Sequence, residues 1–146
     1  MRELPRQLTV DELAELFEGR TRLVELLAVT EDPLGRADDV VARLDEAEKI
    51  EALSAHPAIG QRSGLSERSA VEQGSDRDPA VLSELAYLNQ VYEEKFGFRF
   101  VIFVAGRPKR EVLEVLRERI ANTREQELDT ACHELVAIAR DRWTRT

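Results

Sequence analysis

The stretch Ser54-Ala55-His56-Pro57-Ala58-Ile59-Gly60 divides the chain, and a second polar segment, Ser69-Ala70-Val71-Glu72-Gln73-Gly74, follows it closely. Because proline disfavours helical backbone at the residue before it, a helix that reaches this point must end near Ala55. In the second segment, positions i, i+3 and i+4 share one face if the segment is helical, and they hold Ser69, Glu72 and Gln73. A histidine at a helix exit that faces a carboxylate is a candidate acid–base pair.

The sequence on both sides of this stretch predicts helices. Three segments have the form of a capping box, which marks a helix start, at Thr9–Glu12, Asp45–Glu48 and Thr123–Gln126. Asp38 or Asp39 is a candidate cap for a short helix between the first two. Pro79 suits the first turn of a longer helix that ends at Gly97. We therefore expect one all-α domain over residues 1–146, a bundle of about seven to nine helices.

One segment does not fit a purely helical interpretation. Phe98-Arg99-Phe100-Val101-Ile102-Phe103-Val104 has the β-branched and aromatic composition of a strand. No second segment of that kind is available to pair with it, and a buried strand without a partner leaves its backbone groups unsatisfied. The sequence therefore predicts a buried extended segment or a helical turn here.

Composition and charge limit the classes of function. The formal net charge of -8 argues against a nucleic-acid-binding protein and against attraction to anionic membranes. No run reaches the roughly 18 apolar residues of a membrane span. The N-terminus lacks the apolar run of a signal peptide, and Cys132 is the only cysteine, so we expect a cytoplasmic protein.

The last predicted helix carries an apolar stripe that continues into Arg142. A guanidinium on that stripe should point inward and needs an anionic partner, because an unpaired buried charge is costly. Glu72 or a bound carboxylate can fill this role. On the same helix, Cys132 is expected in the core and His133 on the solvated face. Two distant histidines without clustered carboxylates predict no metal site.

The motifs together resemble the 2-oxo-4-hydroxy-4-carboxy-5-ureidoimidazoline (OHCU) decarboxylases of urate breakdown. The resemblance runs from about Ile50 to the C-terminus and is weak before that. It rests on ordered segments: Ala55-His56-Pro57-Ala58-Ile59-Gly60, Ser69-x-x-Glu72-Gln73-x-Gly74, Leu88-Asn89-x-x-Tyr92-Glu93-x-Lys95-Phe96-Gly97-Phe98-x-Phe100-Val101-Ile102, Arg119-x-x-Asn122, and Ile138-Ala139-x-x-Arg142.

The resemblance implies an all-α homodimer that uses no metal or organic cofactor and converts OHCU into (S)-allantoin and carbon dioxide. It implies that His56 donates a proton, that Glu72 is its partner carboxylate and that Arg142 binds the substrate. It places further substrate contacts at Pro57, Ser69, Gln73, Phe100, Ile102 and Val104.

Other interpretations stay open from the residues alone. His56 by itself is more often a helix-ending residue bonded to backbone, and Glu72 by itself is more often a solvated carboxylate. The N-terminal third is short and lacks segments common in the family, with Arg20-Thr21-Arg22 and Asp32-Pro33-Leu34 in their place. The alternative function is a non-catalytic helical module that binds a small ureide or a protein partner.

Overall fold

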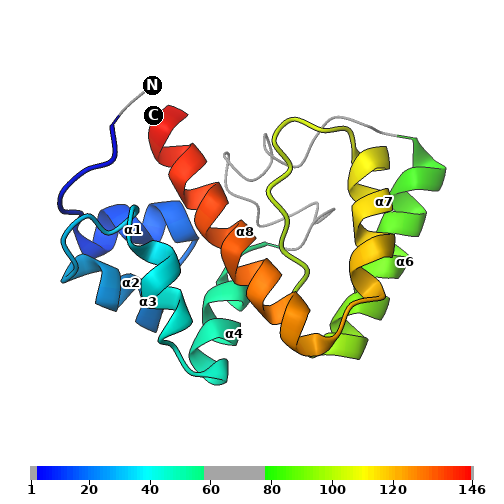
Figure 1. The fold of residues 1–146 in the computed structure, drawn as a ribbon. Coiled ribbons are helices and arrows are strands. Elements are labelled where there is room, and N and C mark those ends of the chain that lie inside the picture. The colour runs from blue at the N-terminus through cyan, green and yellow to red at the C-terminus, as the bar shows by residue number, and fades with distance from the viewer. Residues whose placement is uncertain (1–2, 58–77, 146) are drawn as a thin grey trace.

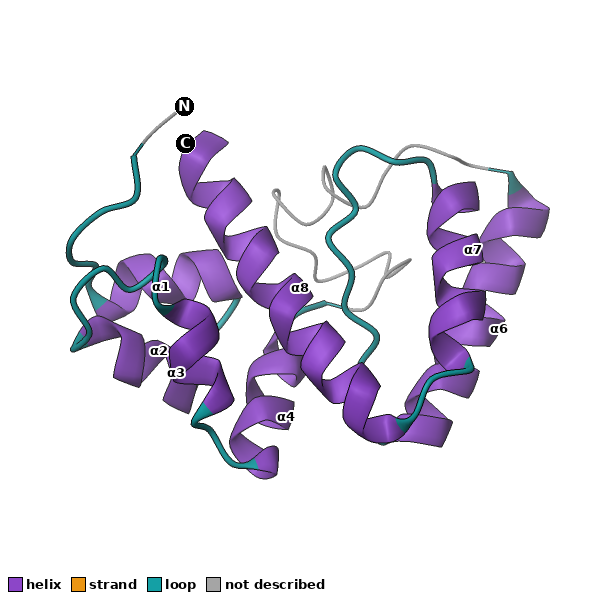
Figure 2. Cartoon of the chain, viewed as in Figure 1, coloured by secondary structure: helices purple, strands orange, loops and turns teal. Residues whose placement is uncertain are grey.

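The computed structural model describes residues 3–57 and 78–145, and these ranges form helices joined by loops, with no strand in them (Figure 2). The predicted all-α class is therefore confirmed. In chain order the helices are α1 Val10–Phe17, α2 Arg22–Ala28, α3 Ala37–Ala42, α4 Glu46–Ala55, α6 Pro79–Phe96, α7 Lys109–Ile120 and α8 Arg124–Arg145.

Local capping explains where several helices begin. The Thr9 and Asp45 side chains each accept a hydrogen bond from the backbone of the third helical residue, whose glutamate reaches back to the cap. Gln126 and Thr123 exchange the same pair of bonds at the start of α8. Pro79 opens α6, and Gly97 ends it in the left-handed conformation at φ 79°. These predicted boundaries are confirmed.

The predicted cap of the short third helix was wrong. Helix α3 begins after Arg36, whose side chain makes no capping bond, and Asp38 and Asp39 lie in the first turn. Their charges are favourable there because the helix dipole is positive at that end. The Asp38 carboxylate instead pairs with Arg140 at 3.1 Å and His133 at 3.3 Å, both on α8.

Helix α8 runs through the middle of the molecule (Figure 1). Helices α1, α3 and α4 pack against it, and α2 packs on α1, α3 and α4. Helices α6 and α7 pack on each other on the other side of α8 and run in the same direction, because the segment between them carries the chain back. The apolar stripe of α8 is buried as predicted, and Cys132 belongs to the core, whereas the His133 side chain is exposed.

The segment between α6 and α7 is the predicted buried extended piece. Phe98, Phe100, Val101, Ile102 and Val104 are buried, although the segment forms no strand. Side chains from other elements and from the following turn satisfy several of its backbone groups. Arg119 on α7 donates to the Val101 carbonyl at 2.7 Å, Glu134 on α8 accepts from the Phe103 N–H at 3.3 Å, and Arg107 donates to the carbonyls of residues 103 and 104. These bonds supply part of what a neighbouring strand would provide.

No helix in the described ranges has both the length and the apolar character needed to cross a membrane.

Candidate functional site

His56 lies at the exit of α4, where the backbone leaves the helix. Its ψ of 137° is extended, as the following proline requires, and its N–H donates to the Leu53 carbonyl at 3.2 Å. Arg99, from the extended segment, donates to the carbonyls of Ser54, at 3.1 Å, and of His56 itself. The end of α4 is therefore tied to a segment that follows more than forty residues later in the chain.

The imidazole of His56 is half-buried, and its Nδ1 atom is fully enclosed without a hydrogen-bond partner among the described residues. Burial lowers the pKa of His56 to about 4, and the cations of Arg142 and Arg99 act in the same direction, whereas Glu18 opposes them. The ring is therefore neutral at pH 7 in the free protein. A buried ring nitrogen without a protein partner is suited to a ligand.

Arg142 points inward from the last third of α8, as its place on the stripe predicted. It is only 2% exposed, and its Nη1 atom donates to the Leu16 carbonyl at 2.9 Å. The same atom lies 3.1 Å from Oε1 of Glu18, the residue that ends α1. Glu18 is thus an anionic partner of this cation, and the sequence interpretation missed it. The only sequence signal was its position beside Gly19, at a predicted helix end.

The structure describes only some of the other predicted site residues. Pro57 is half-buried beside His56. Phe100, Ile102 and Val104 are buried on the extended segment, and their predicted contacts with substrate stay predictions. Ser69, Glu72 and Gln73 lie outside the described residues, so the predicted pairing of His56 or Arg142 with Glu72 also stays a prediction.

A second polar cluster lies in the core and contacts the extended segment through Arg119. Its members are Tyr92, Arg119, Asn122 and Glu127. The Glu127 carboxylate is completely buried and accepts from the Tyr92 hydroxyl at 2.7 Å, from Arg119 Nε at 2.8 Å and from Asn122 at 2.9 Å. Burial and the Glu127 carboxylate together raise the pKa of Tyr92. The Arg119 guanidinium also lies 4.6 Å from the Phe100 ring centre. Through Tyr92, Arg119 and Glu127 the cluster joins α6, α7 and α8, and through Val101 it joins them to the extended segment.

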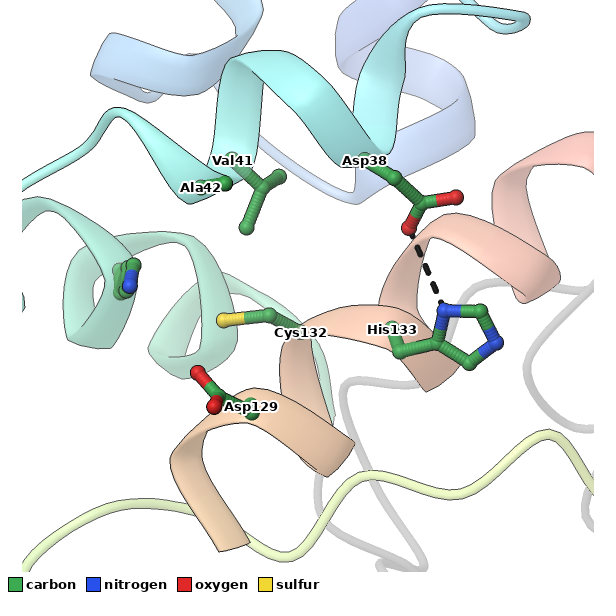
Figure 3. Close-up of a pocket in the computed structure, with 7 residues that line it drawn as sticks. Asp38, Val41, Ala42, Asp129, Cys132 and His133 are labelled. Atoms are coloured by element: carbon green, nitrogen blue, oxygen red, sulfur yellow. Dashed lines mark ion pairs between the residues drawn. The ribbon is translucent and has the colours of Figure 1, made fainter. Parts of the chain in front are cut away.

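A hollow that α4 helps to line contains the single cysteine. Its lining comes from α3, α4 and α8 and includes Asp38, Asp129, Cys132 and His133, with His133 paired to Asp38 (Figure 3). Burial raises the pKa of the Cys132 thiol to about 11, so it is protonated at neutral pH. Within residues 3–57 and 78–145, no three His, Cys, Asp or Glu side chains are grouped so as to hold a metal ion.

These observations define a class: an all-α protein in which helices distant in sequence bring together a buried guanidinium and an imidazole nitrogen that has no partner within residues 3–57 and 78–145. The particular family follows from comparison with known proteins. The family model described as OHCU decarboxylase matches residues 2–144, so the chain belongs to that family.

Individual relatives agree with this assignment. The OHCU decarboxylase of Halalkalicoccus jeotgali is 32% identical over 105 residues, which is 69% of this chain and 60% of the relative. The bifunctional uric acid degradation protein of Arabidopsis thaliana is 37% identical over 105 residues, or 66% of this chain and 32% of that protein. The matched region therefore spans less than two thirds of both curated relatives.

The fold comparison covers more of the chain. A crystal structure of an OHCU decarboxylase in the presence of (S)-allantoin superimposes with a TM-score of 0.75 and 26% identity. The match covers 92% of this chain and 96% of the solved one. The likeness includes the N-terminal helices, where the sequence resemblance is weak.

Proposed function

We propose that this protein is an OHCU decarboxylase, which converts OHCU into (S)-allantoin and carbon dioxide in urate breakdown. The observation that carries the proposal is the His56 ring, whose Nδ1 is buried and unpartnered among the described residues and which lies within electrostatic range of the Arg142 cation. Membership of the family and the likeness to a decarboxylase solved in the presence of (S)-allantoin support it.

The chemistry requires an acid near the substrate carbon. When the bond to the carboxylate breaks, carbon dioxide leaves, and the electron pair stays on carbon, delocalised into the neighbouring carbonyl. A proton from the imidazolium of His56 then forms the new C–H bond on one face, which sets the handedness of the product. The substrate acts as its own electron sink, so we propose no cofactor.

The low pKa of His56 has a consequence for this step. The ring is neutral in the free protein at pH 7 and must gain a proton before it can act as the acid. A bound carboxylate near the ring favours the imidazolium, because an opposite charge raises the pKa of histidine. Substrate binding would thus supply the charge that converts His56 into a proton donor, while Arg142 holds the anionic group of the substrate.

The test is a coupled assay in which OHCU is generated from urate and the optical activity of the allantoin formed is followed. The wild-type protein should accelerate the formation of (S)-allantoin over the spontaneous reaction, which gives no excess of either enantiomer. His56→Asn should abolish the acceleration with an unchanged helical circular dichroism spectrum. His133→Asn is the matched control, because it removes the exposed histidine of α8. No acceleration by ample wild-type protein would reject the proposal and leave a ureide-binding or partner-binding module.

We further propose that Glu72 orients the His56 ring and that Pro57, Ser69, Gln73, Phe100, Ile102 and Val104 contact the substrate. The resemblance described above supports these roles. A crystal structure with (S)-allantoin tests them: the product should lie between His56 and Arg142, with Glu72 within hydrogen-bond distance of the ring. A Glu72 carboxylate that faces solvent in that complex would contradict its role.

A cytoplasmic homodimer is the proposed state of the protein. The single cysteine is buried in the core and contributes no disulfide within the chain, which suits a reducing compartment. Light scattering after gel filtration should give twice the mass of 16.6 kDa. A mass of one chain at micromolar concentration would reject the dimer.

A further inference from the structure

The first helix contributes a charged group to the candidate site, although the N-terminal third carries the weakest resemblance. Glu18 ends α1 in the left-handed conformation, at φ 67°. Its side chain is 16% exposed, and Oε1 lies 3.1 Å from Nη1 of Arg142. The Leu16 carbonyl, two residues earlier, accepts a hydrogen bond from the same nitrogen at 2.9 Å. The end of α1 therefore offers two acceptors to one buried guanidinium.

The same turn also lies close to the end of α4. A Cβ atom built on Gly19 would lie 3.2 Å from the Cβ atom of Ala55, the residue before His56. The left-handed backbone at Glu18 is uncommon for a residue with a side chain. The C-terminus of α1 is thus held between α4, which carries His56, and α8, which carries Arg142.

We propose that Glu18 is a positioning residue of the site, which holds the Arg142 guanidinium in place and balances the positive charge around His56. This inference rests on the proposed function, in which Arg142 binds the anionic substrate and His56 supplies the proton. Glu18 acts through these two side chains and does not itself contact the reacting atoms.

The charges around His56 support this role. Among the described residues, three charged groups act on its ring: Arg142 from α8, Arg99 from the extended segment and Glu18 from the end of α1. Two of them are cations, which disfavour the imidazolium, and Glu18 opposes them. Without the Glu18 carboxylate, the ring would be harder to protonate, and the guanidinium would lose a charge-assisted hydrogen bond.

Steady-state kinetics with OHCU can separate positioning from simple structural support. Glu18→Gln should raise KM about tenfold, the loss expected for one charge-assisted hydrogen bond to the substrate-binding group. A loss of folded protein would lower the apparent kcat and leave KM unchanged. Glu18→Asp keeps the charge and should recover part of the lost affinity. Glu15→Gln, on an exposed position of the same helix, should leave KM unchanged.

A second measurement does not depend on turnover. In an NMR titration of the His56 ring, Glu18→Gln should lower the pKa relative to wild type, whereas Glu15→Gln should not. Wild-type KM together with a wild-type His56 titration in Glu18→Gln would overturn this proposal and leave the decarboxylase function standing. Failure of the proposed function is a different result: wild-type protein would show no acceleration, whatever the titration shows.

Discussion

Arg119 Nε lies 2.8 Å from Glu127 Oε1, and both side chains are buried where α7 meets α8. The pair does more than join two helices. Because Arg119 also donates to the Val101 carbonyl, it fixes the extended segment on which Phe100, Ile102 and Val104 lie. A polar cluster at the core thus holds one of the pieces proposed to contact the substrate.

Removal of the Glu127 carboxylate should therefore be costly. Glu127→Ala leaves a buried guanidinium, the Tyr92 hydroxyl and the Asn122 amide without their acceptor, and we expect a loss of about 3–5 kcal/mol in the free energy of unfolding. Chemical denaturation monitored by circular dichroism measures this loss. Glu118→Ala, at an exposed position near the end of α7, is the control and should change stability by less than about 0.5 kcal/mol. Similar stabilities for the two variants would contradict the role of the cluster.

Arg99 should hold the exit of α4 and act on the His56 ring at the same time. Arg99→Ala removes two hydrogen bonds to the carbonyls of Ser54 and His56, so we expect a loss of about 1–3 kcal/mol in stability. The pKa of His56 should rise, because the Arg99 cation is one of the charges that lower it. NMR titration of the ring and thermal unfolding measure the two effects. In the control Arg43→Ala, which removes an exposed arginine at the end of α3, both should match wild type. An unchanged His56 titration in Arg99→Ala would show that this charge does not act on the ring.

The stability of the protein should depend on pH through His56. Its pKa is about 4 in the folded protein against 6.5 for the free side chain, so the unfolded chain binds more protons between these values. Stability is therefore fully present above about pH 6.5 and falls as the pH is lowered toward 4. Across this window, wild type should lose on the order of 2 kcal/mol more than His56→Asn, allowing for the partial exposure of the ring.

Urea denaturation at a series of pH values measures this difference, with His133→Asn as the control that removes the exposed histidine. Parallel pH curves for wild type and His56→Asn would mean that the folded protein does not disfavour the protonated ring.

Cys132 should be unreactive while the protein is folded. The thiol is 3% exposed and its pKa is about 11, so on the order of one molecule in a thousand carries the reactive thiolate at pH 8. Labelling by a thiol reagent should proceed at the rate of unfolding and become rapid in denaturant. Cys132→Ala should keep the proposed decarboxylase activity, because the thiol lies on the hollow shown in Figure 3 and has no part in the proposed chemistry. Complete labelling of the native protein within seconds would contradict this placement.

The features that the sequence predicted well depend on short-range interactions. Thr9, Asp45 and Pro79 mark helix starts through contacts within one turn, and Pro57 imposes the extended backbone at His56. The predicted cap of α3 was wrong because a long-range interaction outweighs the local one there. Asp38 had the residue type of a cap, but a longer-range attraction to Arg140 and His133 on α8 occupies its carboxylate.

The sequence by itself determined that the protein is helical, that Arg142 points inward and that the segment after Gly97 is buried, either extended or as a helical turn. Residue spacing and backbone preference act locally, so these properties can be read without knowing what packs against what. Only the tertiary structure decided that Glu18 faces Arg142 and that Arg99 holds the exit of α4. It also decided that Arg119 donates to a backbone carbonyl of the extended segment. Such pairs form because buried charges need partners where packing brings the helices together. A local sequence pattern does not predict which partner that will be.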